Sequence, residues 1–167
     1  MDLPPLRSPR KVKAVPVVYR HDIKLLYQQA HEQNFKRMTP LAYESGHYFK
    51  PTMPDVLSTN GTTRYIEDVI NFLGHHAERV NTMGIKTKTG WRRSGGTNGS
   101  TDVHCEIKIP SQAFPVGWKI EIKNKDTMLK GQIKYQAKMQ RVGVLHSVIR
   151  VGELDLFWDE YYRIIKL

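Results

Sequence analysis

The stretch that most constrains this 167-residue chain runs from Gly99 to Lys123, because it holds two strand-like runs of alternating apolar residues. Asp102 opens the first run, and Glu121 and Lys123 stand in the second, one residue apart. Successive side chains of a strand point to opposite faces, so Glu121 and Lys123 share a face. Prolines and a glycine punctuate the segment between the runs. Pairing of the two runs as a hairpin would therefore bring Asp102 beside Glu121.

Two carboxylates with a lysine beside them are typical of a site for a hard divalent cation and the water that it activates. The same pattern also occurs by chance, where it marks only a solvated strand face. A Gly-rich loop before Asp102 and apolar neighbours around Glu121 and Lys123 favour a nuclease-type site. Gln132 adds to this, because it falls within the apolar arc of the next expected helix, where an amide needs a buried partner or faces a site. We expect Gln132 to reach the three charged residues.

The net charge of +10 and a sequence pI of about 9.7 predict a polyanionic partner, with nucleic acid ahead of an anionic membrane surface. A basic segment surrounds Trp91, and basic residues interleaved with an aromatic ring suit a nucleic-acid backbone and a base. An ordinary solvated hairpin would look the same. The candidate nucleic-acid contacts are Lys86, Lys88, Trp91, Arg92, Arg93, Lys125, Lys130 and Lys134.

Other classes are disfavoured by what the sequence lacks. No apolar run approaches the ~18 residues of a membrane helix, and the N-terminus has no apolar core of a secretory signal. The single cysteine, Cys105, excludes a disulfide framework and is expected in the core, on the strand face opposite Asp102. We therefore expect a cytoplasmic protein with no membrane partner.

The chain divides into two expected regions. Residues 1–60 form a basic, Pro-containing N-terminal extension, with one short helix over 22–37 capped by Asp22 and loops over 39–61. In residues 61–167, Thr62 or Thr63 is expected to cap a helix that ends near His76. Strands over 78–83 and in the central stretch, a helix over 128–142, a strand over 144–151 and a helix over 153–165 follow. This order predicts an α/β fold with a central mixed sheet flanked by helices.

The order and the motifs resemble the restriction-endonuclease-like fold of the PD-(D/E)xK nucleases, with its αβββαβ core, and more narrowly its virus-type replication-repair nuclease (VRR-NUC) branch. The matching pieces are R-V-N-T at 79–82, G-S-T-D at 99–102 and I-E-I-K at 120–123, followed by Leu129, Gly131, Gln132, Tyr135 and Gly143. The resemblance covers residues 63–157. Many members of this branch are small phage proteins, so the resemblance suggests a phage origin and, for a phage protein, the host cytoplasm.

The resemblance implies a set of metal ligands. Asp102 and Glu121 would bind Mg²⁺ or Mn²⁺, with the main-chain carbonyl of Ile122 as a further ligand. Glu67 matches the acidic residue of the family's first helix and could hold a second metal. The chain departs from the family pattern just before Asp102, where Ser100 and Thr101 replace a proline that is not a ligand.

The resemblance also implies catalytic roles and a substrate. Lys123 would orient or polarise the attacking water and stabilise charge at the phosphate, and Gln132 would support the site from its helix. The expected function is a divalent-metal-dependent DNA endonuclease, selective for branched or Holliday-junction-like DNA, in repair, recombination or phage replication. A homodimer would suit a two-fold symmetric junction. The alternatives are a non-catalytic nucleic-acid-binding protein and a restriction-type endonuclease, and RNA remains an alternative substrate.

Overall fold

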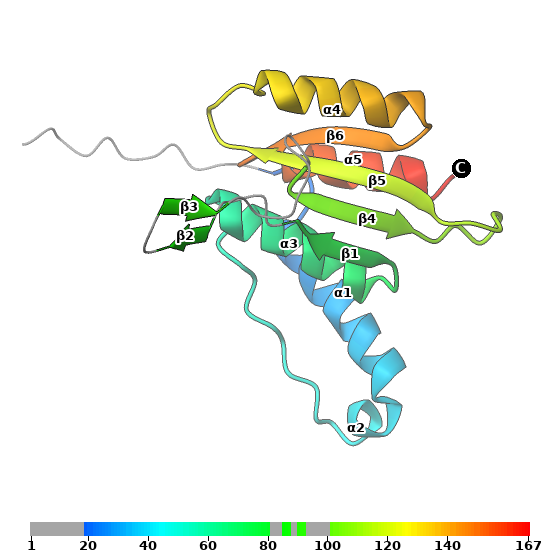
Figure 1. Cartoon of the computed structure of the whole chain (residues 1–167). Coiled ribbons are helices and arrows are strands. Elements are labelled where there is room, and N and C mark those ends of the chain that lie inside the picture. The colour runs from blue at the N-terminus through cyan, green and yellow to red at the C-terminus, as the bar shows by residue number, and fades with distance from the viewer. Residues whose placement is uncertain (1–18, 81–84, 88–89, 93–100) are drawn as a thin grey trace, which may run out of the picture.

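The computed structural model (Figure 1) describes residues 19–80, 85–87, 90–92 and 101–167. Within these residues the chain forms an α/β fold in which β1 to β5 follow α3 and are followed in turn by α4, β6 and α5. The helices are α1 (Ile23–Met38), α2 (Pro40–Glu44), α3 (Thr59–Phe72), α4 (Lys130–Arg141) and α5 (Leu154–Ile164). The strands are β1 (His76–Arg79), β2 (Ile85–Thr87), β3 (Gly90–Arg92), β4 (Val103–Ile107), β5 (Val116–Lys123) and β6 (Leu145–Arg150).

The main sheet has four strands in the order β1-β4-β5-β6, and β2 and β3 form a separate two-stranded sheet. β4 pairs antiparallel with both β1 and β5, whereas β6 pairs parallel with β5, so the sheet is mixed. This confirms the expected mixed sheet flanked by helices. It also confirms that the two runs of the central stretch pair as a hairpin, which is β4–β5.

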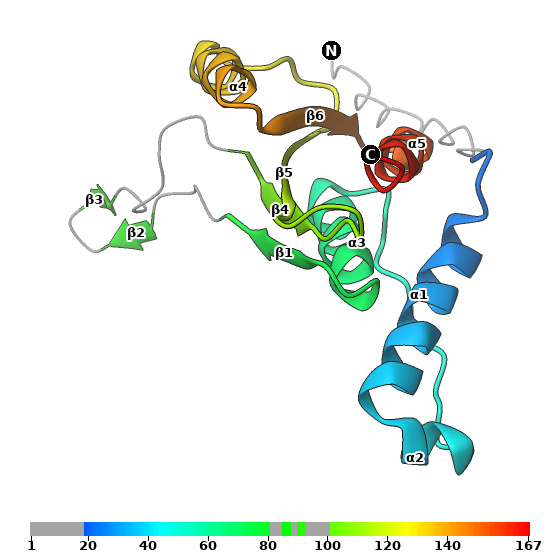
Figure 2. The same cartoon turned by 90° about the vertical axis from the view of Figure 1, so that its right-hand side faces the viewer.

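The helices lie on both faces of this sheet. Figure 2 shows α4 on one side of the sheet and α1, α3 and α5 on the other. The face toward α3 and α5 is the apolar one, since alternate residues of β4 and β5 on that face are fully buried. Cys105 is among them, on the face opposite Asp102 as expected.

Aromatic residues hold α5 on the sheet. The ring of Trp118 on β5 stacks on that of Phe157 with centroids 5.6 Å apart and an angle of 4° between the planes. Its indole Nε1–H donates to the Ser147 hydroxyl of β6 at 2.8 Å, so this buried N–H group has a hydrogen-bond acceptor. The expected closing helix is present as α5, and its buried residues are Leu154, Phe157, Trp158, Tyr161 and Ile164.

The first helix is confirmed with its predicted cap, because the Asp22 carboxylate accepts a hydrogen bond from Leu25 N at 2.9 Å. It packs into the main core: the ring of Tyr27 stacks on that of Tyr65 in α3, with centroids 5.4 Å apart. The segment over 39–61, expected as loops, contains the short helix α2, which begins at Pro40. Proline is favoured at the first helical position, where its missing N–H would have no partner.

Some element boundaries differ from those expected. α3 begins at Thr59, with the Ser58 side chain as its cap, so the prediction of a cap at Thr62 or Thr63 is wrong. Both threonines are buried inside the helix. The helix ends at Phe72 rather than near His76, because Gly74 turns the chain with a left-handed φ of 89° and β1 begins two residues later. No helix within the described ranges is long and apolar enough to cross a membrane.

Two phenylalanines provide a matched test of this core. Phe157 is 0% exposed between the sheet and α5, whereas Phe114 in the β4–β5 loop is 82% exposed. Phe157→Ala should lower the free energy of unfolding by about 3–5 kcal/mol, because it leaves a cavity beside Trp118. Phe114→Ala should change it by less than about 0.5 kcal/mol. Urea denaturation measures both, and equal effects would contradict the packing described.

Candidate active site

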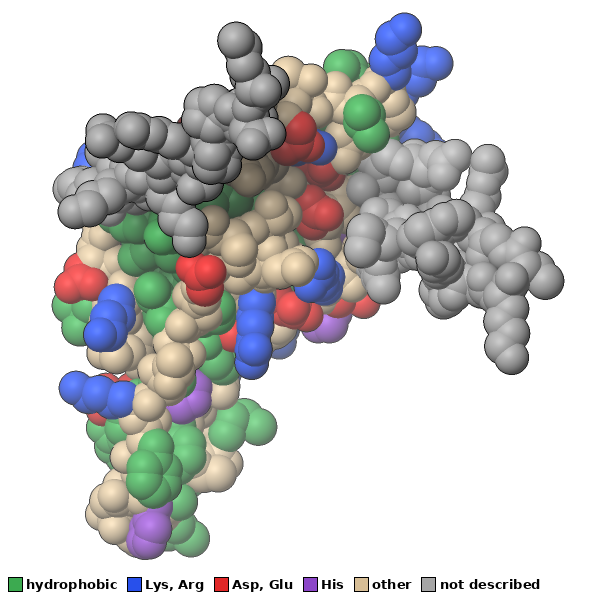
Figure 3. All heavy atoms as spheres, turned by 90° about the vertical axis from the view of Figure 1, so that its left-hand side faces the viewer, with side chains coloured by type: hydrophobic (Ala, Val, Ile, Leu, Met, Phe, Trp, Pro, Cys, Tyr) green, Lys and Arg blue, Asp and Glu red, His purple; other side chains and the backbone are tan. Residues whose placement is uncertain are grey.

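The β4–β5 hairpin brings the predicted acidic residues together at one end of the sheet. Its register pairs Val103 with Ile120, so Asp102, one residue before β4, lies opposite Glu121 near the end of β5. Figure 3 faces this end of the molecule and shows acidic side chains gathered near its centre, with Lys and Arg side chains around them. The expected juxtaposition of Asp102 and Glu121 is therefore present.

Asp102 also completes the strand pairing. Its Oδ2 accepts a hydrogen bond from the backbone N–H of Ile122 at 2.8 Å, beyond the last paired residue of β4. The N–H and C=O of one strand residue point to the same side, so the Ile122 carbonyl also points toward the Asp102 side. The carbonyl of Lys123 points the other way, where it accepts from Val151 N at 2.7 Å.

Glu121 receives two donors on one oxygen. Its Oε1 accepts from Lys123 Nζ at 3.1 Å and from the side-chain amide of Gln132 on α4. The Gln132 carbonyl oxygen accepts from Leu129 N at 2.9 Å, so each end of this amide has a partner of the right kind. The predicted contact between Gln132 and the cluster is thus present. Both bonds use Oε1 and leave Oε2 as the second acceptor of this carboxylate.

These charged groups are unusually buried for a sheet end. Glu121 is 2% exposed and Lys123 is 6% exposed. Burial, followed by the nearby charge of Asp102, raises the pKa of Glu121 to about 7. Burial also raises the pKa of Asp102, although the Ile122 N–H and Lys123 oppose the shift. For Lys123, burial alone would lower the pKa, but its hydrogen bonds to Glu121 and Asp126 outweigh burial and raise it.

Asp126 is a member of this cluster that the sequence analysis missed. Its Oδ2 lies 3.2 Å from Lys123 Nζ, and its Oδ1 accepts from Asn124 N at 3.2 Å. An aspartate three residues after the lysine, at the first turn beyond a strand, is the signal that could have identified it, because such a turn folds the chain back on the strand end.

Glu67 is not brought into the cluster. It lies half-buried on α3, and its charge acts on Cys105, whose pKa is raised mainly by burial. Cys105 faces α3, whereas Asp102 faces the opposite side of the sheet. Among the residues that the structure describes, no three or more His, Cys, Asp or Glu side chains form a group that could hold a metal ion.

The basic candidates fall into two sets. Lys88 and Arg93 lie outside the described residues, and the side chains of Lys86, Trp91 and Arg92 on β2 and β3 are likewise not described. The others are exposed: Lys125 follows β5, and Lys130 and Lys134 lie on α4. α4 has no buried residue, so the predicted apolar arc of that helix is only half-buried, and Val142 just beyond it is 66% exposed.

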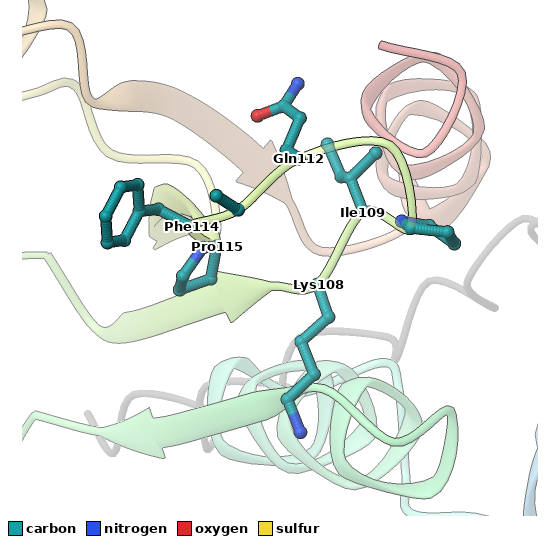
Figure 4. A pocket seen from close by; sticks show the side chains of 7 residues that line it. Lys108, Ile109, Gln112, Phe114 and Pro115 are labelled. Atoms are coloured by element: carbon teal, nitrogen blue, oxygen red, sulfur yellow. The ribbon is translucent and has the colours of Figure 1, made fainter.

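The β4–β5 loop lies away from the acidic cluster. It connects the C-terminal end of β4 to the N-terminal end of β5, whereas Asp102 and Glu121 lie at the other ends of these strands. The loop lines a pocket with its own residues, from Lys108 to Pro115 (Figure 4). This pocket does not include any residue of the cluster.

Comparison with known proteins adds no relative: the chain matches no protein-family model, and no curated protein or solved structure shows significant similarity to it.

The raised pKa of Glu121 can be tested by its effect on stability. In the unfolded chain glutamate loses its proton near pH 4.3, whereas in the folded protein the pKa is about 7. Between these values the folded state binds more protons, so the contribution of Glu121 to stability falls as pH rises. Glu121→Gln should therefore gain stability over the metal-free wild type between about pH 4.5 and 7, by on the order of 3 kcal/mol.

The measurement is urea denaturation of both proteins in EDTA across this pH range, and the quantity compared is their difference in unfolding free energy. The matched control, Glu106→Gln, removes an exposed carboxylate from β4 and should lack the rise. A difference for Glu121→Gln that stays constant with pH would contradict the environment described.

Proposed function

We propose that this protein is a divalent-metal-dependent nuclease with a restriction-endonuclease-like core, of the VRR-NUC type. The observation that carries the proposal is the buried Glu121–Lys123 pair beside Asp102 at one open end of the mixed sheet. Burying an ion pair costs solvation that its attraction does not reliably return. Residues with perturbed ionisation gathered in this way are characteristic of catalytic sites. A protein that only binds nucleic acid gains nothing from acids that would face its phosphates.

The residues present fit a hard divalent cation. Asp102 and Glu121 each place one carboxylate oxygen in a protein hydrogen bond and retain a second acceptor, and the Ile122 carbonyl points to the Asp102 side. Mg²⁺ is commonly bound through one or two carboxylates together with waters and substrate phosphates, so a larger acidic group is not required. The mutual repulsion of the two carboxylates also favours a cation between them. When bound, Mg²⁺ or Mn²⁺ supplies a nucleophilic water at neutral pH and charge stabilisation at the phosphate.

The side chains of the cluster have separable roles in this reaction. Asp102 and Glu121 hold the cation. Lys123, kept protonated by its carboxylate partners, stabilises negative charge on the scissile phosphate, and preorganised charge of this kind contributes most in a water-poor site. Gln132 fixes the orientation of the Glu121 carboxylate from α4.

DNA is the proposed substrate, with branched or junction-like forms preferred. The overall charge of +10 would attract a phosphate backbone, and the exposed Lys125 after β5 and Lys130 and Lys134 on α4 are its candidate contacts. Incubation with supercoiled, linear, single-stranded and branched DNA, and with RNA, in Mg²⁺, Mn²⁺ or EDTA, tests the function and its substrate together. Sequence-dependent fragments would indicate a restriction-type enzyme, and binding without cleavage would indicate a pure binding protein.

Asp102→Asn and Glu121→Gln should each reduce DNA cleavage below detection and leave DNA affinity unchanged or tighter, because each removes a negative ligand from the cation. Wild-type protein should cleave in Mg²⁺ or Mn²⁺, and Ca²⁺ should permit binding without turnover, since it tolerates looser geometry and activates water poorly. Gel-based cleavage and fluorescence anisotropy measure the two quantities. Full activity in EDTA would exclude the metal-dependent mechanism.

Gln132→Leu should keep the protein folded and lower the cleavage rate by at least tenfold, because Glu121 loses the amide that orients it. Gln136→Leu makes the same substitution one turn further along α4 and serves as the control for helix stability. Circular dichroism reports folding, and single-turnover cleavage reports the rate per folded molecule. Equal rates for Gln132→Leu and Gln136→Leu would show that Gln132 has no specific role in catalysis.

A further inference from the structure

Lys123 lies between two carboxylates rather than beside one. Its Nζ is 3.1 Å from Glu121 Oε1 and 3.2 Å from Asp126 Oδ2. The Glu121 side chain is 3% exposed, whereas that of Asp126 is 64% exposed, so one partner lies inside the protein and the other at its surface. A lysine ammonium has three donors. Two of them point to these carboxylates, which fixes the direction of the third.

Asp126 is itself held in place. Its second oxygen, Oδ1, accepts from the backbone N–H of Asn124, which follows directly after Lys123 at the end of β5. The surface carboxylate is thus tied to the same strand end that carries the lysine. It can act on the ammonium group as a fixed partner and not as a freely rotating charge.

We propose that Asp126 is a positioning residue that holds the Lys123 ammonium partway between the buried Glu121 and the surface, where a substrate phosphate arrives. This inference rests on the proposed nuclease function and adds a residue to its site. Without Asp126, Glu121 is the one carboxylate among the described residues that contacts the ammonium, so the group moves inward onto Oε1. It then lies farther from the phosphate and competes with the cation for the same ligand.

The direction in which the cleavage rate changes when Asp126 is neutralised distinguishes a positioning role from a purely electrostatic one. Asp126 is an exposed negative group beside a site for a polyanion, so its removal should strengthen DNA binding by relieving repulsion. A residue with no other role would therefore give an equal or faster reaction when neutralised. A positioning residue gives the opposite result for the chemical step, because a displacement of about 1 Å in a reacting group can cost ~100-fold in rate.

The experiment compares kcat and KM for DNA cleavage in Mg²⁺ by the wild type, Asp126→Asn, Asp126→Glu and the charge-matched control Glu106→Gln. Asp126→Asn should lower kcat by about 10- to 100-fold with KM unchanged or lower, and Asp126→Glu should recover part of the loss. Glu106→Gln should resemble the wild type. A kcat for Asp126→Asn within twofold of the wild type would overturn the proposal.

A second readout does not depend on activity. In NMR spectra of ¹⁵N-lysine-labelled protein, an ammonium signal persists only where hydrogen bonds slow proton exchange with water, and Lys123→Ala identifies the signal of Lys123. Asp126→Asn should broaden or abolish it, and Glu106→Gln should preserve it. An unchanged signal in Asp126→Asn would overturn the proposed contact. If the signal is lost but the wild type cleaves no substrate, the nuclease assignment fails while the contact between Asp126 and Lys123 is supported.

Discussion

The candidate site depends first on one hydrogen bond, from the backbone N–H of Ile122 to the Asp102 carboxylate. Where β4 stops pairing, this side chain continues the ladder on one edge of β5, while β6 pairs with the other edge through Lys123. A shift of one residue in the pairing would turn Glu121 and Lys123 into the apolar core and expose Ile120 and Ile122. The alternation that buries the core is therefore the same property that presents both charged side chains on the opposite face.

The candidate site also depends on the contact between the charged cluster and α4. This helix has no buried residue and covers the sheet only with half-buried side chains. Gln132 contributes a specific link, because its amide joins Glu121 on β5 to the backbone of Leu129 at the start of the helix. The polar contact orients the helix over the site, where apolar packing is sparse. The position of α4 and the orientation of the Glu121 carboxylate are thus coupled.

The sequence predicted the hairpin, the mixed sheet and the gathering of Asp102, Glu121, Lys123 and Gln132, because each follows from local periodicity. In a strand or a helix, the position of a residue in the repeat determines the face to which its side chain points. Asp126 was missed since a turn has no such period, and its bond to Lys123 depends on the path of the chain after β5. The assignment of Glu67 to the metal site came from resemblance and not from periodicity, and the contacts described for the cluster do not include Glu67. The caps of α3 were misjudged because tertiary packing buries Thr62 and Thr63.

The cluster contains more acidic than basic groups, whereas the chain as a whole is positively charged. Two carboxylates, from Glu121 and Asp126, contact the ammonium of Lys123, and that of Asp102 lies close enough to interact with its charge, in a protein whose net charge is +10. The surrounding basic groups attract a polyanion over long range, but the cluster repels a phosphate at close range. A bound divalent cation would reverse the local sign without changing the distant field. On the proposed function, the same cation would therefore control both close approach of the phosphate and the chemistry that follows.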